Sequence, residues 1–252
     1  MIRQMNFLID KRALLCYKFN VSVISRNDDE FESMRDNETA KKEVIRAFFD
    51  DAKERAEYLL VLNAKKRANE ASTLCLVYID SFSQWLFWPR SQVGQNFVEA
   101  LLKYSGDLEF ALVHPLFLIR AWAAMKDHTW KTFATRLKTL FPGPKYSLFS
   151  QDEFLTHISQ SFNPNDIKLL KDKLWKGFIA NVVYKHLRNP SIHSFRGAAE
   201  VSFDATMYQN QPVQSITFSR LHDALMKLID EARKRSLANN QWFGNDSIVK
   251  GA

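Results

Sequence analysis

Hydrophobic residues recur at helical spacing along most of this chain, beginning near Thr39. In the first such stretch, lysines and arginines lie among the remaining positions, and the apolar residues on one side are Val44, Ile45, Phe48, Phe49, Ala52, Ala56, Leu59 and Leu60. This pattern predicts a long amphipathic helix whose basic face is either a binding surface or an ordinary solvated face. A second long helix is predicted over residues 72–88 and ends at Pro89.

Local signals predict several shorter helices in the middle of the chain. The periodicity indicates helices over 92–104, over 107–126 with a break at Pro115, and over 128–140. Ser150 and Glu153 have the spacing of a capping box, so a helix should start there. Asn163 followed by Pro164 gives another helix start. From that start, apolar residues cover a broad arc, which predicts one continuous, deeply buried helix ending at Pro190, where proline removes a backbone N–H.

Two segments favour β structure. Alternating apolar residues on either side of a turn at 209–212 predict a small hairpin over about 200–218, including Ile216 and Phe218. Ser219 then caps a last helix that finishes near Arg235. Residues 1–37 are rich in β-branched and aromatic residues and then become acidic, which predicts a short β arm and a loop. We therefore expect a mainly α protein, with an arm at 1–37, a helical-bundle domain at 38–240 and a tail at 241–252.

Composition narrows the functional class. The 252 residues include only 7 Gly and 7 Pro, too few turn formers for an all-β sandwich or barrel. Cys16 and Cys75 are too few for a disulfide framework, and Cys75 falls among predicted core positions. No signal-peptide pattern opens the chain and no apolar run is long enough for a membrane span, so we expect a cytoplasmic protein without a membrane partner. The formal net charge of +7 favours polyanionic partners, nucleic acid first among them.

Several active-site classes lack their motifs. The chain has no glycine-rich dinucleotide or Walker-type loop, no GxSxG elbow and no HExxH. Among the 6 histidines, only His186 and His193 lie close in sequence, and a zinc site would need two further ligands from distant segments. We expect neither a metal nor another cofactor.

The most informative segment is 184–196, where five groups that are or can become cationic fall within twelve residues. They are Lys185, His186, Arg188, His193 and Arg196. Such a density of positive charge is suited to binding the negatively charged phosphodiester backbone of a nucleic acid. With a break at Pro190, the side chains of Arg188 and His193 can turn toward one cleft.

An arginine beside a histidine is sufficient to cut RNA without a metal. The imidazole has a pKa near neutrality and can exchange the proton of the 2′-hydroxyl or of the 5′-oxygen leaving group. The guanidinium can stabilise charge that develops on the phosphorane. Asn189 can hold either group, or a phosphate oxygen, by a hydrogen bond.

The order Arg188-Asn189-x-x-x-His193, after a predicted buried helix in a helical chain, resembles the R-x4-6-H signature of the HEPN superfamily. The resemblance extends over about 39–236: two long antiparallel helices, the motif helix and a closing helix. Extra helical material between Pro89 and Pro164, and the hairpin, depart from the simplest members.

This resemblance implies a HEPN-like helical bundle and a metal-independent endoribonuclease of a toxin or antiphage-defence system. Two protomers of a homodimer would form a composite site with Arg188, His193 and Asn189 as catalytic residues. Lys185, Arg196 and His186 would line the approach of the RNA, and an antitoxin or defence protein is an implied partner.

Two alternatives stay open at this stage. Arg188 and His193 can instead cap a helix end and bind a carboxylate, which is a structural role. A HEPN-like chain can also be a noncatalytic module for dimerisation, nucleic-acid binding or partner binding, since fold does not imply function. If the nuclease interpretation holds, Arg188→Ala and His193→Ala should abolish cleavage and cost only about 1–2 kcal/mol of stability.

Overall fold

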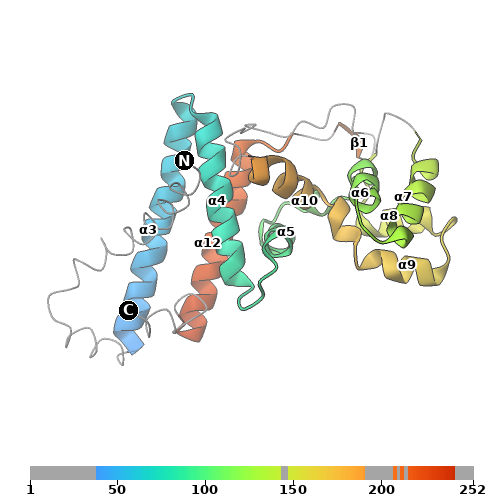
Figure 1. The fold of residues 1–252 in the computed structure, drawn as a ribbon. Coiled ribbons are helices and arrows are strands. Elements are labelled where there is room, and N and C mark those ends of the chain that lie inside the picture. Colours follow the sequence, from blue (N-terminus) through green and yellow to red (C-terminus); the bar gives the residue numbers. More distant parts are fainter. Residues whose placement is uncertain (1–37, 143–146, 191–206, 209–210, 213–214, 242–252) are drawn as a thin grey trace.

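A computed structural model of the chain describes residues 38–142, 147–190, 207–208, 211–212 and 215–241. The described part is mainly helical, which confirms the predicted class. Two groups of helices lie side by side, and α10 runs between them (Figure 1). The predicted arm at 1–37 lies outside the described residues, as do His193 and Arg196.

The helices follow one another in the order α3 Glu38–Ala64, α4 Ala68–Leu86, α5 Val93–Tyr104, η1 Leu108–Ala111, α6 Pro115–Ala123, α7 His128–Leu140, α8 Gln151–Ile158, α9 Pro164–Lys171, η2 Leu174–Gly177, α10 Ile179–Val183, η3 Tyr184–Arg188 and α12 Phe218–Asn239. The strands are β1 Met207–Tyr208 and β2 Gln211–Pro212.

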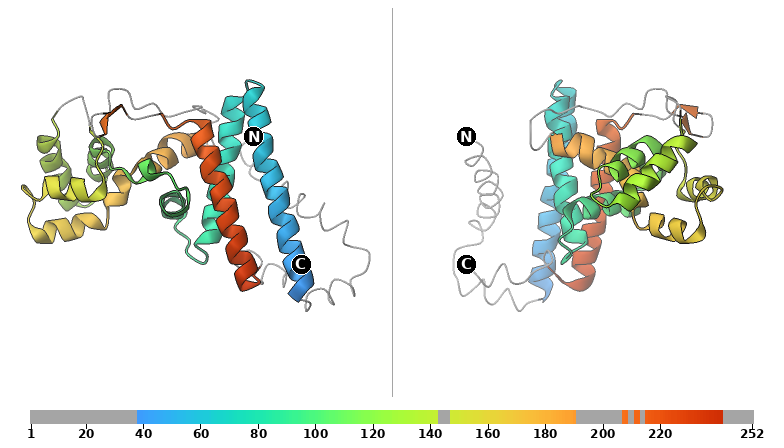
Figure 2. Two further views of the ribbon diagram at one scale, coloured as in Figure 1. Left: turned by 180° about the vertical axis from the view of Figure 1, so that it is seen from behind. Right: turned by 45° about the vertical axis from the view of Figure 1, so that its right-hand side comes forward.

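The first group is a bundle of α3, α4 and α12, with α5 packed against α4 and α12. A tight turn with Lys66 at a positive φ of 61° reverses the chain, so α3 and α4 run antiparallel. Figure 2 shows from behind that α12 lies along both helices. The Phe49 and Phe82 rings meet across α3 and α4 at 6.2 Å, and His222 Nε2 donates to the Ala56 carbonyl at 3.0 Å. The predicted long helices and the core position of Cys75 are confirmed.

The second group comprises α6 to α9, and its helix starts follow the local signals. Pro115 occupies the first turn of α6. Ser150 and Glu153 form the predicted capping box at α8. Asn163 caps α9 by accepting from Asp166 N at 2.8 Å. Aromatic contacts join the helices of this group, such as the Trp122 and Trp130 rings at 5.6 Å.

The prediction of one continuous helix from Asn163 to Pro190 is wrong. The segment consists of α9, η2, α10 and η3, and Phe178 is extended between η2 and α10. Phe178 forms an isolated bridge with Val113, and a Cβ added at Gly177 would lie 2.8 Å from Leu118 Cβ. Pairing with a distant segment and close packing on α6 therefore override the local helical periodicity. Helical conformation continues through Pro190, the last described residue of this segment.

Only part of the predicted hairpin falls within the described residues. Met207 pairs with Pro212 and Tyr208 with Gln211 in a short antiparallel ladder, and residues 200–206 lie outside the described part. The extension of the hairpin to Phe218 is wrong, because Phe218 begins α12. Its buried side chain packs near His222 at 5.8 Å between ring centroids, so it joins the bundle core.

None of the helices in the described ranges is long and apolar enough to cross a membrane.

Candidate functional site

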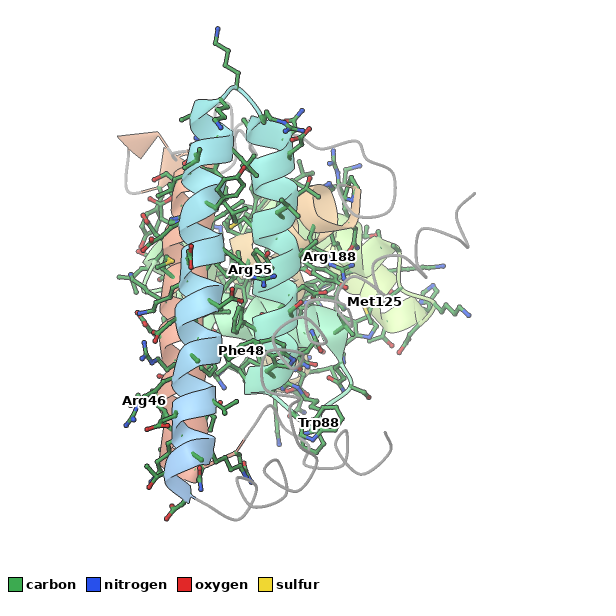
Figure 3. All side chains as sticks on the ribbon, turned by 90° about the vertical axis from the view of Figure 1, so that its left-hand side faces the viewer. Arg46, Phe48, Arg55, Trp88, Met125 and Arg188 are labelled. Atoms are coloured by element: carbon green, nitrogen blue, oxygen red, sulfur yellow. The ribbon has the colours of Figure 1, made fainter. Side chains whose placement is uncertain are left out.

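Arg188 lies at the end of a π-helical turn that contacts α4. The π-helix η3 covers Tyr184–Arg188 and directly follows α10. Single π-helical turns are rare and frequently occur at functional sites, because the wider turn displaces side chains from the ordinary helical positions. Figure 3 shows Arg188 beside α4, on the side away from α3.

The Arg188 guanidinium forms an ion pair with Asp80 from the middle of α4. Arg188 Nη2 lies 2.6 Å from Asp80 Oδ2, and the two side chains are 13% and 15% exposed. The residues are 108 positions apart, so the contact ties the motif segment, residues 184–190, to the bundle of α3, α4 and α12. Water screens such a largely enclosed pair less than a surface pair, and the orientation of Arg188 is correspondingly better defined.

Two neighbours in sequence, Asn189 and Tyr184, also contact Arg188. Arg188 Nη1 donates to Asn189 Oδ1 at 3.0 Å, and the guanidinium carbon lies 5.3 Å from the centre of the Tyr184 ring. Asn189 was expected to hold a group of the site, and in the structure it contacts Arg188. The guanidinium is therefore held from three sides before any ligand binds.

A chain of hydrogen bonds continues from Asp80 into α5. Gln84 Nε2 donates to Asp80 Oδ1 at 3.5 Å, and Asn96 Nδ2 donates to Gln84 Oε1 at 2.8 Å. Asn96 is fully buried and accepts from Arg90 Nε at 2.5 Å. Arg90 in turn forms an ion pair with Glu99 at 3.0 Å. Through these contacts α4, α5 and the loop between them support the carboxylate that holds Arg188.

Sequence reasoning did not assign these supporting residues to the site. The available signal was that Asp80 and Gln84 interrupt the mainly apolar stretch 74–88. They lie four positions apart, which places them on one helix face. Pattern alone could not identify their partners, because Arg188 and Asn96 lie on other elements.

His186 and Lys185 have other surroundings than Arg188. The exposed His186 ring packs on Phe117 of α6, with 5.1 Å between ring centres. Partial desolvation lowers the pKa of His186, and the nearby charges of Lys185 and Arg120 lower it further. Lys185 is exposed. Of the predicted residues that the structure describes, Arg188 therefore contacts α4, Asn189 contacts Arg188, and His186 contacts α6.

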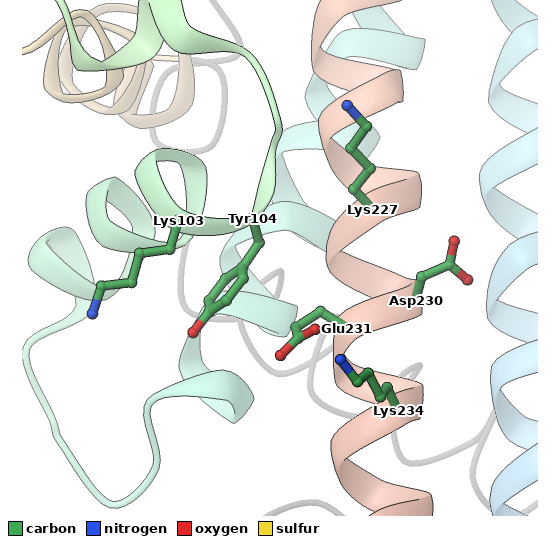
Figure 4. Close-up of a pocket in the computed structure, with 6 residues that line it drawn as sticks. All are labelled: Lys103, Tyr104, Lys227, Asp230, Glu231 and Lys234. Carbon is green, nitrogen blue, oxygen red and sulfur yellow. The ribbon is translucent and has the colours of Figure 1, made fainter.

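No group of three potential metal-ligating side chains occurs within the described ranges. A surface depression lies between α5 and α12 (Figure 4). It is lined by Lys103, Tyr104, Lys227, Asp230, Glu231 and Lys234. Charges of both signs alternate there, and Asp230 pairs with Lys53 at 2.5 Å. None of the predicted site residues lines it, and its mixed charge favours no ligand class.

Comparison of the chain with family models, with curated proteins and with solved structures found no match.

Proposed function

We propose that this protein is a metal-independent endoribonuclease of HEPN type, acting as a toxin or antiphage-defence effector. The observation that supports the proposal best is the placement of Arg188. It ends a π-helical turn, and Asp80 holds it at 2.6 Å. A guanidinium fixed in advance can stabilise developing negative charge without reorganising during the reaction.

In the proposed reaction the RNA supplies its own nucleophile. The 2′-oxygen attacks the adjacent phosphorus while a base removes its proton, and the bond from phosphorus to the 5′-oxygen breaks as that oxygen receives a proton. The products are a 2′,3′-cyclic phosphate and a 5′-hydroxyl. His193 exchanges these protons, Arg188 stabilises the phosphorane, and Asn189 helps to orient Arg188.

The proposal includes a homodimer. In-line cleavage places the base and the acid on opposite sides of phosphorus, and one chain supplies one Arg188 and one His193. A two-fold axis near the motif would bring two copies together across a cleft. The expected interface would bury more than about 1,000 Å².

The test is incubation of the purified protein with single-stranded RNA in EDTA, followed by analysis of the product ends. Wild-type protein should leave 2′,3′-cyclic phosphate and 5′-hydroxyl ends and should not cut DNA, which lacks the 2′-hydroxyl. Arg188→Ala and His193→Ala should abolish cleavage. Arg46→Ala serves as the matched control, because Arg46 is an exposed arginine on α3 outside the proposed site. A strict requirement for magnesium or manganese would refute this mechanism.

A noncatalytic binding or dimerisation module is the second candidate. The ion pair between Arg188 and Asp80 is compatible with it, because an arginine with a purely structural role would make the same contact. An RNA-binding protein that leaves RNA intact under all conditions tested would support this alternative.

A further inference from the structure

A cluster of basic side chains lies where α6, η2 and η3 come together. The π-helix η3 contributes Lys185 and His186, and it follows α10, which packs against η2. Helix α6 packs against η2 as well. We refer to the following residues as the α6–η3 basic surface: Arg120, Lys173, Lys176, Lys185 and His186.

The positive charges of this surface act on one another. Burial lowers the pKa of Lys176, and the charges of Lys185 and Lys173 lower it further. Lys185 and Arg120 act in the same direction on the pKa of His186. In the part of the chain that the structure describes, none of these side chains forms an ion pair, whereas Arg188 and Arg136 are each paired with an aspartate. Such mutual repulsion would be relieved by a bound polyanion.

Aromatic rings hold two of these groups in place. The Lys176 ammonium lies over the Trp175 ring, 4.6 Å from its centre, and the exposed His186 ring packs on Phe117. A lysine held against an aromatic ring loses less side-chain freedom when it binds a phosphate. Partial burial and the nearby cations lower the pKa of the His186 imidazole, and its ring is inclined by 54° to the Phe117 ring.

Cationic side chains together with aromatic rings favour one class of polyanion over the others. Proteins bind single-stranded nucleic acid through basic grooves that follow the backbone and through aromatic rings on which bases stack. In duplex nucleic acid the bases are already stacked, and an acidic protein has none to offer. Lys185 and His186 lie only three and two positions before Arg188, so a strand bound here would lie close to the segment that carries the proposed cleavage site.

We propose that the α6–η3 basic surface binds single-stranded RNA, with Arg120, Lys173, Lys176 and Lys185 contacting phosphates and His186 stacking on a base. The choice of RNA over single-stranded DNA rests on the proposed function. Binding itself does not require the cleavage chemistry.

The test measures binding with a strand that cannot be cut. The probe is a fluorescein-labelled 2′-O-methyl oligoribonucleotide of about 12 nucleotides, within the usual site size. Fluorescence anisotropy in EDTA at several salt concentrations compares wild-type protein with Lys176→Gln/Lys185→Gln. The control is Lys131→Gln/Lys138→Gln, which removes the same net charge from exposed positions on α7.

The surface double variant should bind more weakly, and the slope of log affinity against log salt should fall by about 1.4, the value for two phosphate contacts on a single strand. The α7 control should keep both the affinity and the slope of the wild type. His186→Ala should weaken binding by about 5-fold through loss of stacking, with little change in slope.

Three outcomes would overturn the proposal: no binding by wild-type protein, an equal loss in the α7 control, or displacement of the probe by polyglutamate as effective as displacement by unlabelled RNA. The last result would assign the surface to an acidic protein. The nuclease function is tested separately. If the protein binds RNA but does not cleave unmodified RNA, the proposed enzymatic function is refuted and the proposed binding surface is retained.

Discussion

Asp80→Ala is the sharpest perturbation of the proposed site, because it removes the carboxylate that holds Arg188 without changing Arg188 itself. The substitution deletes the 2.6 Å contact to Arg188 Nη2 and the acceptor for Gln84 Nε2. Arg188 would then lie in a largely enclosed position without the Asp80 carboxylate, and its orientation would be less well defined.

The expected loss of stability follows from the exposure of the pair. Removing one partner of a fully buried ion pair costs about 3–5 kcal/mol, whereas an exposed pair contributes about 0.2–1 kcal/mol. The side chains of Asp80 and Arg188 are 15% and 13% exposed, between these cases but nearer the buried one. We therefore expect Asp80→Ala to lower the free energy of unfolding by about 2–3 kcal/mol.

Urea unfolding measures this loss, and Asp51→Ala is the matched control. Asp51 pairs with Arg55 at 2.8 Å within α3, but the two side chains are 37% and 41% exposed. That substitution should cost only about 0.3–0.5 kcal/mol. If Asp80→Ala costs no more than Asp51→Ala, the assignment of Asp80 as the support of Arg188 is wrong.

Cleavage separates positioning from stability alone. At a temperature where both variants are folded, Asp80→Ala should reduce kcat by about 100-fold, the typical effect of a misplaced catalytic group, with a small change in KM. Asp80→Asn retains an acceptor oxygen toward Arg188 and should restore part of kcat. An Asp80→Ala enzyme that is folded and fully active would refute a role for this contact in cleavage.

Three further substitutions test other parts of the structure. Arg188→Ala should abolish RNA cleavage and lower the free energy of unfolding in urea by about 2–3 kcal/mol, because it leaves the Asp80 carboxylate without its cationic partner. Gly177→Ala should cost about 1–3 kcal/mol in thermal or urea unfolding, because its Cβ would lie 2.8 Å from Leu118 Cβ; an unchanged midpoint would contradict the packing. Burial lowers the pKa of His114 to about 4, whereas the pKa of this side chain in the unfolded chain is about 6.5. Below about pH 6.5 the unfolded chain therefore binds a proton that the folded protein does not bind, and stability falls as the pH falls from about 6.5 to about 4. Wild-type protein should therefore lose about 2 kcal/mol more than His114→Gln between pH 7 and pH 5, and equal losses would rule out this contribution.

The expected stability of Arg188→Ala differs from the sequence-based expectation of about 1–2 kcal/mol, which assumed that Arg188 has no enclosed partner. The pairing with Asp80 makes that assumption wrong. The carboxylate contact predicted by the structural alternative is present, and it is equally compatible with a catalytic arginine that needs support. The activity of Asp80→Asn and Asp80→Ala therefore carries more information than the stability of either.

Local sequence determined where many helices begin. Ser150, Asn163 and the prolines at 115 and 164 act within one helical turn through capping hydrogen bonds or a preset φ, so their neighbours in sequence suffice. The amphipathic period likewise predicted α3 and α4, because a stripe of apolar residues must be buried whatever covers it. Arg188 and Asn189 could be proposed from sequence because their chemistry and spacing are local properties.

Tertiary structure decided the features that depend on distant partners. The break near Gly177 requires Val113 and Leu118, and neither is visible in the periodicity of the segment itself. Asp80 meets Arg188 across 108 positions, because packing of α4 against the motif segment brings an isolated polar residue to the guanidinium. Likewise, Arg120 and Lys176 join Lys185 only after α6 and η2 pack together, since charge along a sequence does not specify which charges share a surface.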